Sequence, residues 1–143
     1  MTFLGSSGCG YSTSDEVREA VPAIAARFRE TAERDGWEFV THGIAVEWDV
    51  GQGVDYLGSL LRWDQISVGR NWGNEMIISH YWSRGESPVT PTLILSERTI
   101  SSPQAGETAT TLIASEPTPI AVVTGMSGLQ RLQRGEDVPG WTA

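Results

Sequence analysis

Short apolar runs alternate with segments of helical periodicity along most of the chain. Strands are predicted at residues 2–5, 39–48, 65–68 and 92–95, and further downstream at residues 110–114 and 120–124. Helices are predicted from Thr13 onward and at residues 54–61, 74–82 and 127–134, the last with Leu129 and Leu132 facing inward. This alternation is typical of β-α-β units on a largely parallel sheet, so the sequence predicts an α/β fold.

The first helix has the clearest pattern. Thr13 and Glu16 have the spacing of a capping box, which predicts that the helix begins there. A single apolar stripe follows, made by Val17, Val21, Ile24 and Phe28. Pro22 lies inside this helix and removes one backbone hydrogen bond, so we expect a kink or a late helix start.

The composition removes several classes of function. The 143 residues carry a formal net charge of −8, and all 10 basic residues are arginine. The chain therefore lacks a Schiff-base lysine, a P-loop lysine and a dense basic patch, and we expect no nucleic-acid partner. Cys9 is the single cysteine, which excludes an intramolecular disulfide and a cysteine-rich metal site. We therefore predict no metal centre.

Length and hydropathy set expectations about the organisation of the protein. One domain spanning residues 1–143 is the expected arrangement. No apolar run approaches the roughly 20 residues of a membrane span, and the first residues lack the pattern of a signal peptide. We therefore expect a cytoplasmic protein without a membrane partner.

A turn rich in glycine and serine, residues 6–12, connects the first strand to the first helix. Such turns bind phosphates or present thiols, because backbone N–H groups at a helix start favour an anion. The phosphate motifs do not fit, since a Walker motif needs Gly-Lys and the dinucleotide motif needs glycine where Thr13 stands. A nucleophile elbow fails because Cys9 takes the place of its last glycine. Cys9 itself remains, either as a reactive thiol or as an incidental small apolar residue.

A second feature lies far along the chain, at Thr90 and Pro91. Proline belongs at strand edges or starts, and Pro91 directly precedes the apolar run at residues 92–95. We predict a cis Thr90–Pro91 bond within roughly 4 Å of Cys9 or its turn. The alternative is a trans proline that merely ends a loop.

The segment from Cys9 to Ser12 reads C-G-Y-S and follows the first strand. It resembles the thioredoxin-like C-x-x-C motif with serine in place of the second cysteine. The later strands, one ending in an acid and one starting after Thr90-Pro91, resemble those of redoxin and TlpA-type thioredoxin-like proteins. The resemblance is clearest over residues 2–100. It implies a thioredoxin-like fold, with a central mixed β-sheet flanked by helices on both faces.

The resemblance also implies a role for each motif residue. Cys9 is the attacking thiol, and Ser12 occupies the resolving position. Gly10 and Tyr11 form the dipeptide that tunes the thiol, and Thr90-Pro91 forms the backbone edge that docks the substrate. The first strand is short for a strand at the centre of a sheet, and we therefore expect that the N-terminus of this sequence is truncated.

The function implied in this way is that of a monothiol protein, in which Cys9 exchanges with disulfides or glutathione adducts. Its partner is a disulfide-containing or glutathionylated protein, or a small thiol; no cofactor is expected, with glutathione as a candidate co-substrate. The alternative is a degenerate thioredoxin-like domain that serves as a binding or structural module. C-G-Y-S also resembles the C-G-F-S motif of cluster-binding monothiol glutaredoxins, but their Gly-Gly-Asp segment has no counterpart after Leu95.

Several other residues have a structural and a functional interpretation. His42 is expected to be a satisfied core histidine, and His80 to pack inward or lie on the surface. Glu47 and Asp49 end a strand beside the motif, as solvated acids or, alternatively, with one carboxylate as a proton relay. The tryptophans are expected to anchor the core and loops rather than to form a stacking platform: Trp37, Trp48, Trp63, Trp72, Trp82 and Trp141.

Overall fold

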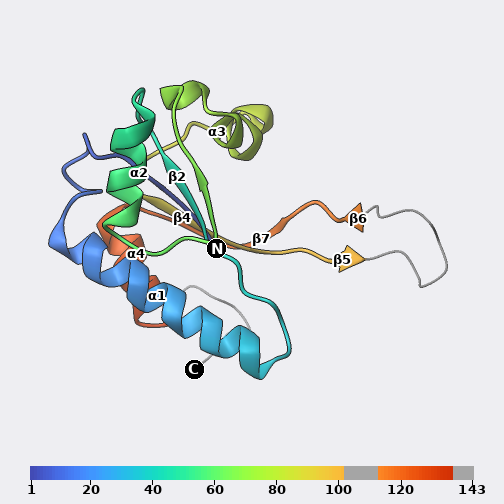
Figure 1. Ribbon diagram of the computed structural model, residues 1–143. Coiled ribbons are helices and arrows are strands. Elements are labelled where there is room, and N and C mark those ends of the chain that lie inside the picture. Colours follow the sequence, from blue (N-terminus) through green and yellow to red (C-terminus); the bar gives the residue numbers. More distant parts are fainter. Residues whose placement is uncertain (102–112, 137–143) are drawn as a thin grey trace.

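A computed structural model describes residues 1–101 and 113–136 of the chain. Its main sheet has the strand order β3-β2-β1-β4-β7 (Figure 1). The strands are β1 (Thr2–Gly5), β2 (His42–Ala45), β3 (Gln65–Ser67), β4 (Thr92–Glu97) and β7 (Thr118–Thr124). β1, β2 and β3 are parallel, whereas β4 and β7 are antiparallel to their neighbours. The α/β class and the mixed sheet are thus confirmed, and only the first three strands are parallel.

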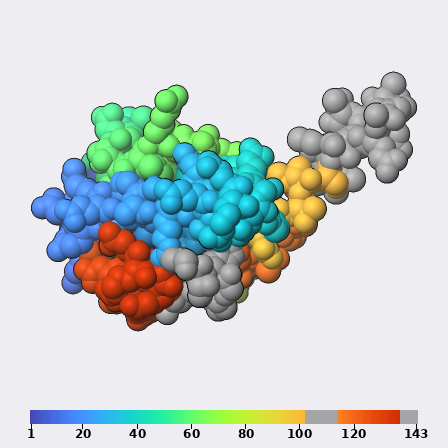
Figure 2. Space-filling view, turned by 90° about the horizontal axis from the view of Figure 1, so that it is seen from below, coloured from blue at the N-terminus to red at the C-terminus, as the bar shows by residue number. Residues whose placement is uncertain are grey.

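Helices cover both faces of this sheet, as predicted. The helices are α1 (Asp15–Arg34), α2 (Val50–Gly58), α3 (Glu75–His80) and α4 (Gly125–Gln133). α1, α2 and α4 contribute to the core on one face, whereas α3 packs on the other. Figure 2 shows α1 and α4 side by side at the surface, in agreement with their many contacts.

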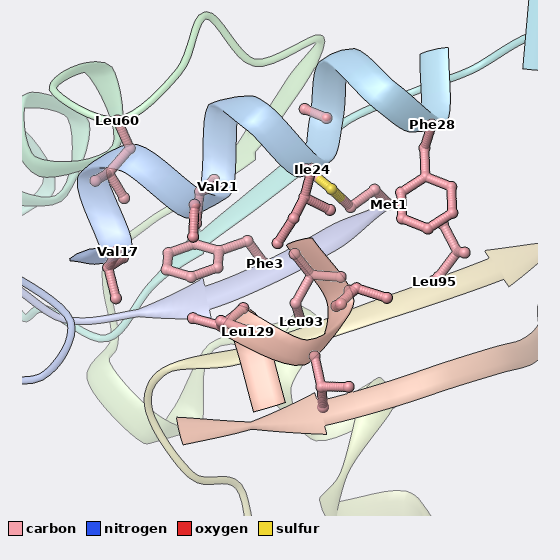
Figure 3. Close-up of a cluster of buried hydrophobic side chains, with 14 of the residues drawn as sticks. Met1, Phe3, Val17, Val21, Ile24, Phe28, Leu60, Leu93, Leu95 and Leu129 are labelled. Atoms are coloured by element: carbon pink, nitrogen blue, oxygen red, sulfur yellow. The ribbon is translucent and has the colours of Figure 1, made fainter. Parts of the chain in front are cut away.

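The larger core lies between α1 and the sheet. Phe3 of β1 is fully buried and points toward Val21 and Ile24 of α1, with Leu93 of β4 close by (Figure 3). The apolar stripe predicted for the first helix is therefore the buried face of α1. Leu129 and Leu132 of α4 are also fully buried, as the spacing predicts.

A smaller core lies on the opposite face. It consists of side chains from this face of the sheet, packed against α3 and the residue that follows α3. The sheet side contributes Leu4, Ile44, Val46 and Ile94, and the helix side contributes Ile77 and Tyr81. Since α3 has only six residues, this face carries much less helix than the other.

Two strand and helix boundaries differ from the prediction. β2 is shorter than the predicted strand at residues 39–48. The last hydrogen bond between β1 and this segment runs from the Val46 N–H to the Gly5 carbonyl at 2.9 Å, and because β1 ends at Gly5, no neighbouring strand continues beside the later residues. α2 begins at Val50 rather than Val54, because the Asp49 side chain caps it by accepting from the Gln52 N–H at 2.7 Å. Glycines in the first turns of α2 obscured its start in the sequence.

The first helix also starts differently. Its N-cap is Ser14, whose hydroxyl accepts from the Val17 N–H, so the predicted capping box at Thr13 and Glu16 is wrong. Thr13 instead turns its hydroxyl back to the Cys9 carbonyl at 3.2 Å. α1 begins before Pro22 and continues unbroken through it, which excludes the late start.

The antiparallel pair β4 and β7 continues into a narrow two-stranded ribbon. Its described strands are β5 (Ile100–Ser101) and β6 (Ile113–Ala114), which lie away from the body of the molecule (Figures 1 and 2). The strand predicted at residues 110–114 is confirmed at Ile113–Ala114, and its first three residues lie outside the described part of the chain, as does Trp141. No helix of the described residues is long and apolar enough to cross a membrane.

Candidate functional site

Cys9 and Thr90 meet although 81 residues separate them. The Cys9 Sγ lies 3.6 Å from the Thr90 carbonyl oxygen, and the Thr90–Pro91 peptide bond is cis. Both parts of the prediction for this pair are confirmed. The sheet order explains the meeting, because β1 and β4 are adjacent and antiparallel, so the end of β1 lies beside the start of β4.

The Pro91 carbonyl also ties the start of α4 to this place. It accepts a hydrogen bond from the Gly125 N–H at 2.9 Å. Gly125 has a φ of +67°, which is unfavourable for other residues, and here glycine allows β7 to turn directly into α4. The turn after β1 and the start of β4 therefore meet at the thiol, and the junction of β7 and α4 is bonded to the start of β4.

The turn around Cys9 is closed by its own backbone hydrogen bonds. The Cys9 N–H donates to the Ser6 carbonyl at 3.2 Å, and the Thr13 N–H donates to the Cys9 carbonyl at 3.1 Å. Because α1 starts only at Asp15, Cys9 does not stand directly at the helix N-terminus as the sequence suggested. The N–H groups that serve the sulfur belong to this preceding turn.

The thiol is perturbed toward its reactive form. Burial raises the pKa of Cys9, but the polar groups of Thr90, Ser12 and Tyr11 around the sulfur outweigh burial, so its pKa lies below the ordinary value. The side chain is partly exposed, which leaves the sulfur accessible. A partly exposed cysteine with a lowered pKa is the environment typical of a nucleophilic thiol.

Ser12 lies beneath the turn with no solvent exposure. Its hydroxyl oxygen has no hydrogen-bond partner among the described residues. Its carbonyl accepts a hydrogen bond from the Tyr56 hydroxyl at 3.1 Å, and burial raises the pKa of Tyr56 well above the usual value, so Tyr56 stays a neutral donor. The resolving position is thus a buried hydroxyl, held from below by α2.

Glu47 is tied to the Cys9 turn more closely than its place in the sequence indicates. It is buried, with 4% exposure, and its Oε1 accepts from the Ser7 N–H at 2.5 Å and the Ser6 hydroxyl at 3.1 Å. Its Oε2 is buried with no partner among the described residues. The expectation of a solvated strand-end acid is therefore wrong for Glu47, which anchors the turn leading to Cys9. Only its position at a strand end, beside the motif, signalled this.

The remaining predicted site residues lie on the rim. Gly10 and Tyr11 are exposed, with Tyr11 69% exposed, whereas Pro91 is buried. Trp48 and Val89, which belong to the loops beside Glu47 and Thr90, are 78% and 51% exposed. The loops that meet at the thiol therefore present apolar surface to solvent.

A polar cleft of about 560 Å³ lies beside the Cys9 turn. Ser7 and Thr13 of the turn line it together with Arg18 of α1. The start of α2 contributes Asp49 and Asp55. The cleft can therefore hold a ligand that carries both signs of charge.

The tryptophans and histidines differ from expectation. Trp63 stacks on Phe3 with ring centroids 5.9 Å apart, as a core residue. Four others are exposed and are not core residues: Trp37, Trp48, Trp72 and Trp82. The loop role that the sequence predicts holds for Trp82, whose indole N–H donates to the Trp72 carbonyl at 3.1 Å. His42 is half-buried rather than fully enclosed, because β2 starts at this residue and its side chain reaches the open end of the sheet.

The described residues contain no group of three or more His, Cys, Asp or Glu side chains placed to hold a metal ion. No protein-family model, curated protein or solved structure matches this chain. What Cys9 does is therefore inferred from its surroundings alone.

Proposed function

We propose that this chain is a thioredoxin-like monothiol protein, in which Cys9 exchanges with disulfides or glutathione adducts. The observation that carries the proposal is the contact of the Cys9 Sγ with the Thr90 carbonyl, 3.6 Å away and next to the cis Thr90–Pro91 bond. A backbone edge beside a thiol can pair with the backbone of an extended substrate and hold its sulfur near the nucleophile.

The chain order also supports the proposal. A strand leads to the cysteine turn and a long helix, a parallel strand lies beside the first, and an antiparallel strand begins with the cis-proline. Helices cover both faces of this mixed sheet. This is the order that the thioredoxin-like resemblance of the sequence implies.

The reaction proceeds in two exchanges. The Cys9 thiolate attacks one sulfur of the target disulfide, a new S–S bond forms to Cys9, and the other target sulfur leaves as a thiolate that takes a proton from water. A second thiol, as thiolate, then attacks the mixed disulfide, forms a disulfide with the target fragment and releases the Cys9 thiolate. Electrons balance, since one disulfide is consumed and one is formed.

The second thiol must come from solution, because the resolving position is Ser12 and Cys9 is the single cysteine. Glutathione suits this step. The polar cleft beside the Cys9 turn supports that choice, since Arg18 matches a carboxylate and Asp49 matches an ammonium group.

A second candidate, a binding module without catalysis, is favoured by one observation. Ser12 is fully buried, so the chain has kept a well-packed turn without a resolving thiol. In that account the Thr90-Pro91 edge is a surface that contacts a partner, and Cys9 is a small side chain that packs in the turn and takes no part in chemistry.

The test is turnover with a glutathionylated peptide, glutathione, glutathione reductase and NADPH. We expect the wild-type chain to release the peptide thiol and to show a Cys9–glutathione adduct by mass spectrometry, and the Cys9→Ser variant to do neither. Equal activity of the two proteins contradicts the proposal. An adduct on Cys9 without turnover supports the binding module.

A further inference from the structure

Two histidines and a methionine, whose side chains are of types that can bind metals, lie at the end of the sheet away from Cys9. His42 stands at the start of β2, whereas Cys9 follows the end of β1, and these two strands are parallel. His42, Met76 and His80 all line one cavity of about 620 Å³. This cavity is separate from the polar cleft beside the Cys9 turn, which shares none of its lining residues.

The three side chains lie on two elements that pack against each other. Met76 and His80 are four residues apart on α3, so they share one face of that helix. His42 and Ile44 alternate to the same face of the sheet, and Ile44 packs against Ile77 of α3 in the smaller core. The strand and the helix that carry the three residues are therefore packed together.

Both imidazoles lack the partners that such groups usually have. His42 and His80 are half-buried, yet neither imidazole makes a hydrogen bond or ion pair with any described residue. An imidazole without such a partner has a ring nitrogen available as a metal ligand.

The charge of the cavity favours a cation. The carboxylates of Glu38, Glu97 and Glu116 line it, against the single guanidinium of Arg98 among its described lining residues. Met76, four residues from His80 on α3 and in the lining of the same cavity, offers its thioether as the third donor. Two imidazoles and a thioether form a soft donor set, which among common biological metals prefers the cuprous ion.

We propose that His42, His80 and Met76 bind a Cu(I) ion in the cavity between α3 and the start of β2. The site is independent of the thiol chemistry proposed for Cys9. Water or another cavity group supplies a fourth ligand where the ion needs one.

The test is an anaerobic competition titration with the coloured Cu(I) chelator bicinchoninate. The parent protein is the Cys9→Ser variant, because a thiolate would itself bind Cu(I). We expect one tight Cu(I) per chain, weakened by about 100-fold in His42→Gln or His80→Gln and by about 10-fold in Met76→Leu, since even the loss of outer-shell partners costs 10- to 100-fold. Met126→Leu, which changes a methionine outside the cavity, is the matched control and keeps the parent affinity.

Two outcomes overturn the proposal. If the parent and the His42→Gln/His80→Gln double variant bind Cu(I) with equal affinity, the imidazoles are not ligands. If Met76→Leu leaves the affinity unchanged, the thioether is not a ligand and the assignment to Cu(I) is wrong. NMR resonances of the imidazole rings test the site in a protein that keeps all three proposed ligands. Both rings must shift together on addition of one equivalent of Cu(I), and unshifted rings contradict the site.

Discussion

The carboxylate of Glu47 accepts a hydrogen bond from the backbone N–H of Ser7, 40 residues earlier in the chain, at 2.5 Å. The same oxygen accepts from the Ser6 hydroxyl, whose oxygen also accepts from the Gly8 N–H at 3.2 Å. A buried group at the end of β2 therefore holds the three residues that precede Cys9. The position of the thiol depends on this tie as well as on β1.

Replacing Glu47 with alanine is expected to loosen the Cys9 turn and destabilise the fold. The change removes a charge-assisted hydrogen bond from a buried site, which costs about 2 kcal/mol. In a domain of this size that lowers the melting temperature by about 8 °C. We also expect the pH midpoint of Cys9 alkylation to rise toward that of the unfolded chain, because the turn no longer holds its hydrogen-bond donors at the sulfur.

Asp49→Ala is the matched control for this prediction. It removes the N-cap of α2, which costs about 1 kcal/mol, or about 4 °C in melting temperature. Because Asp49 makes no hydrogen bond to the Cys9 turn, the alkylation midpoint should stay that of the wild-type chain. A midpoint that moves equally in both variants contradicts the positioning role of Glu47.

Replacing Ser12 with cysteine is expected to create an internal disulfide with Cys9. Ser12 is fully buried three residues after Cys9, and its backbone N–H is among the groups around the sulfur, so a thiol at this position is expected within reach of Cys9. A neighbouring thiol resolves a mixed disulfide without waiting for a collision, and we expect disulfide reductase activity with dithiothreitol at least about 10-fold above wild type.

Ser83→Cys adds a thiol at an exposed position on the 3-10 turn Trp82–Arg84 and serves as the control. It should gain neither the internal disulfide nor the activity. If Ser12→Cys stays reduced under oxidising conditions, the C-x-x-S interpretation is wrong. If the disulfide forms without activity, the binding module becomes the better account.

Asp64 makes part of the stability depend on pH. Its Oδ2 accepts from the Thr41 N–H at 2.7 Å and the Thr41 hydroxyl at 2.8 Å, which lowers the pKa of Asp64. A lowered folded pKa adds stability that is present above the unfolded pKa of about 3.9 and is lost as the pH falls through the folded pKa. Since the carboxylate is about half exposed, screening reduces the effect to about 1 kcal/mol.

We therefore expect Asp64→Asn to melt about 4 °C below wild type at neutral pH. The difference should shrink in acid, as the pH falls through the lowered folded pKa of Asp64 and the wild-type carboxyl is protonated. Calorimetry at neutral pH and in acid measures this. A difference that is the same at both, or that grows in acid, contradicts the sign of the pKa shift.

The sequence was sufficient for the features that depend on local pattern and chain order. The stripe from Val17 to Phe28 predicted the buried face of α1, because its spacing follows the helical repeat. The meeting of Cys9 with Thr90 was predicted from the order of strands and motifs along the chain. Neither needed knowledge of individual side-chain contacts.

What the sequence did not reveal depends on contacts between distant residues. Glu47 looked like a solvated strand-end acid, because its burial arises from Ser6 and Ser7, which lie a whole helix earlier in the chain. Thr13 and Ser14 are both good capping residues, and the bond of Thr13 back to Cys9 leaves Ser14 as the cap. Single-sequence pattern carries no signal for such choices.

The pH dependence of Cys9 alkylation tests the central claim most directly. The rate of reaction with iodoacetamide follows the fraction of thiolate, and the same chain unfolded in urea provides the reference. Because the pKa of Cys9 is lowered in the folded chain, we predict that the folded protein reaches half its maximal rate at a lower pH than the unfolded chain. A midpoint equal to or above that of the unfolded chain contradicts the account of Cys9 as a nucleophile.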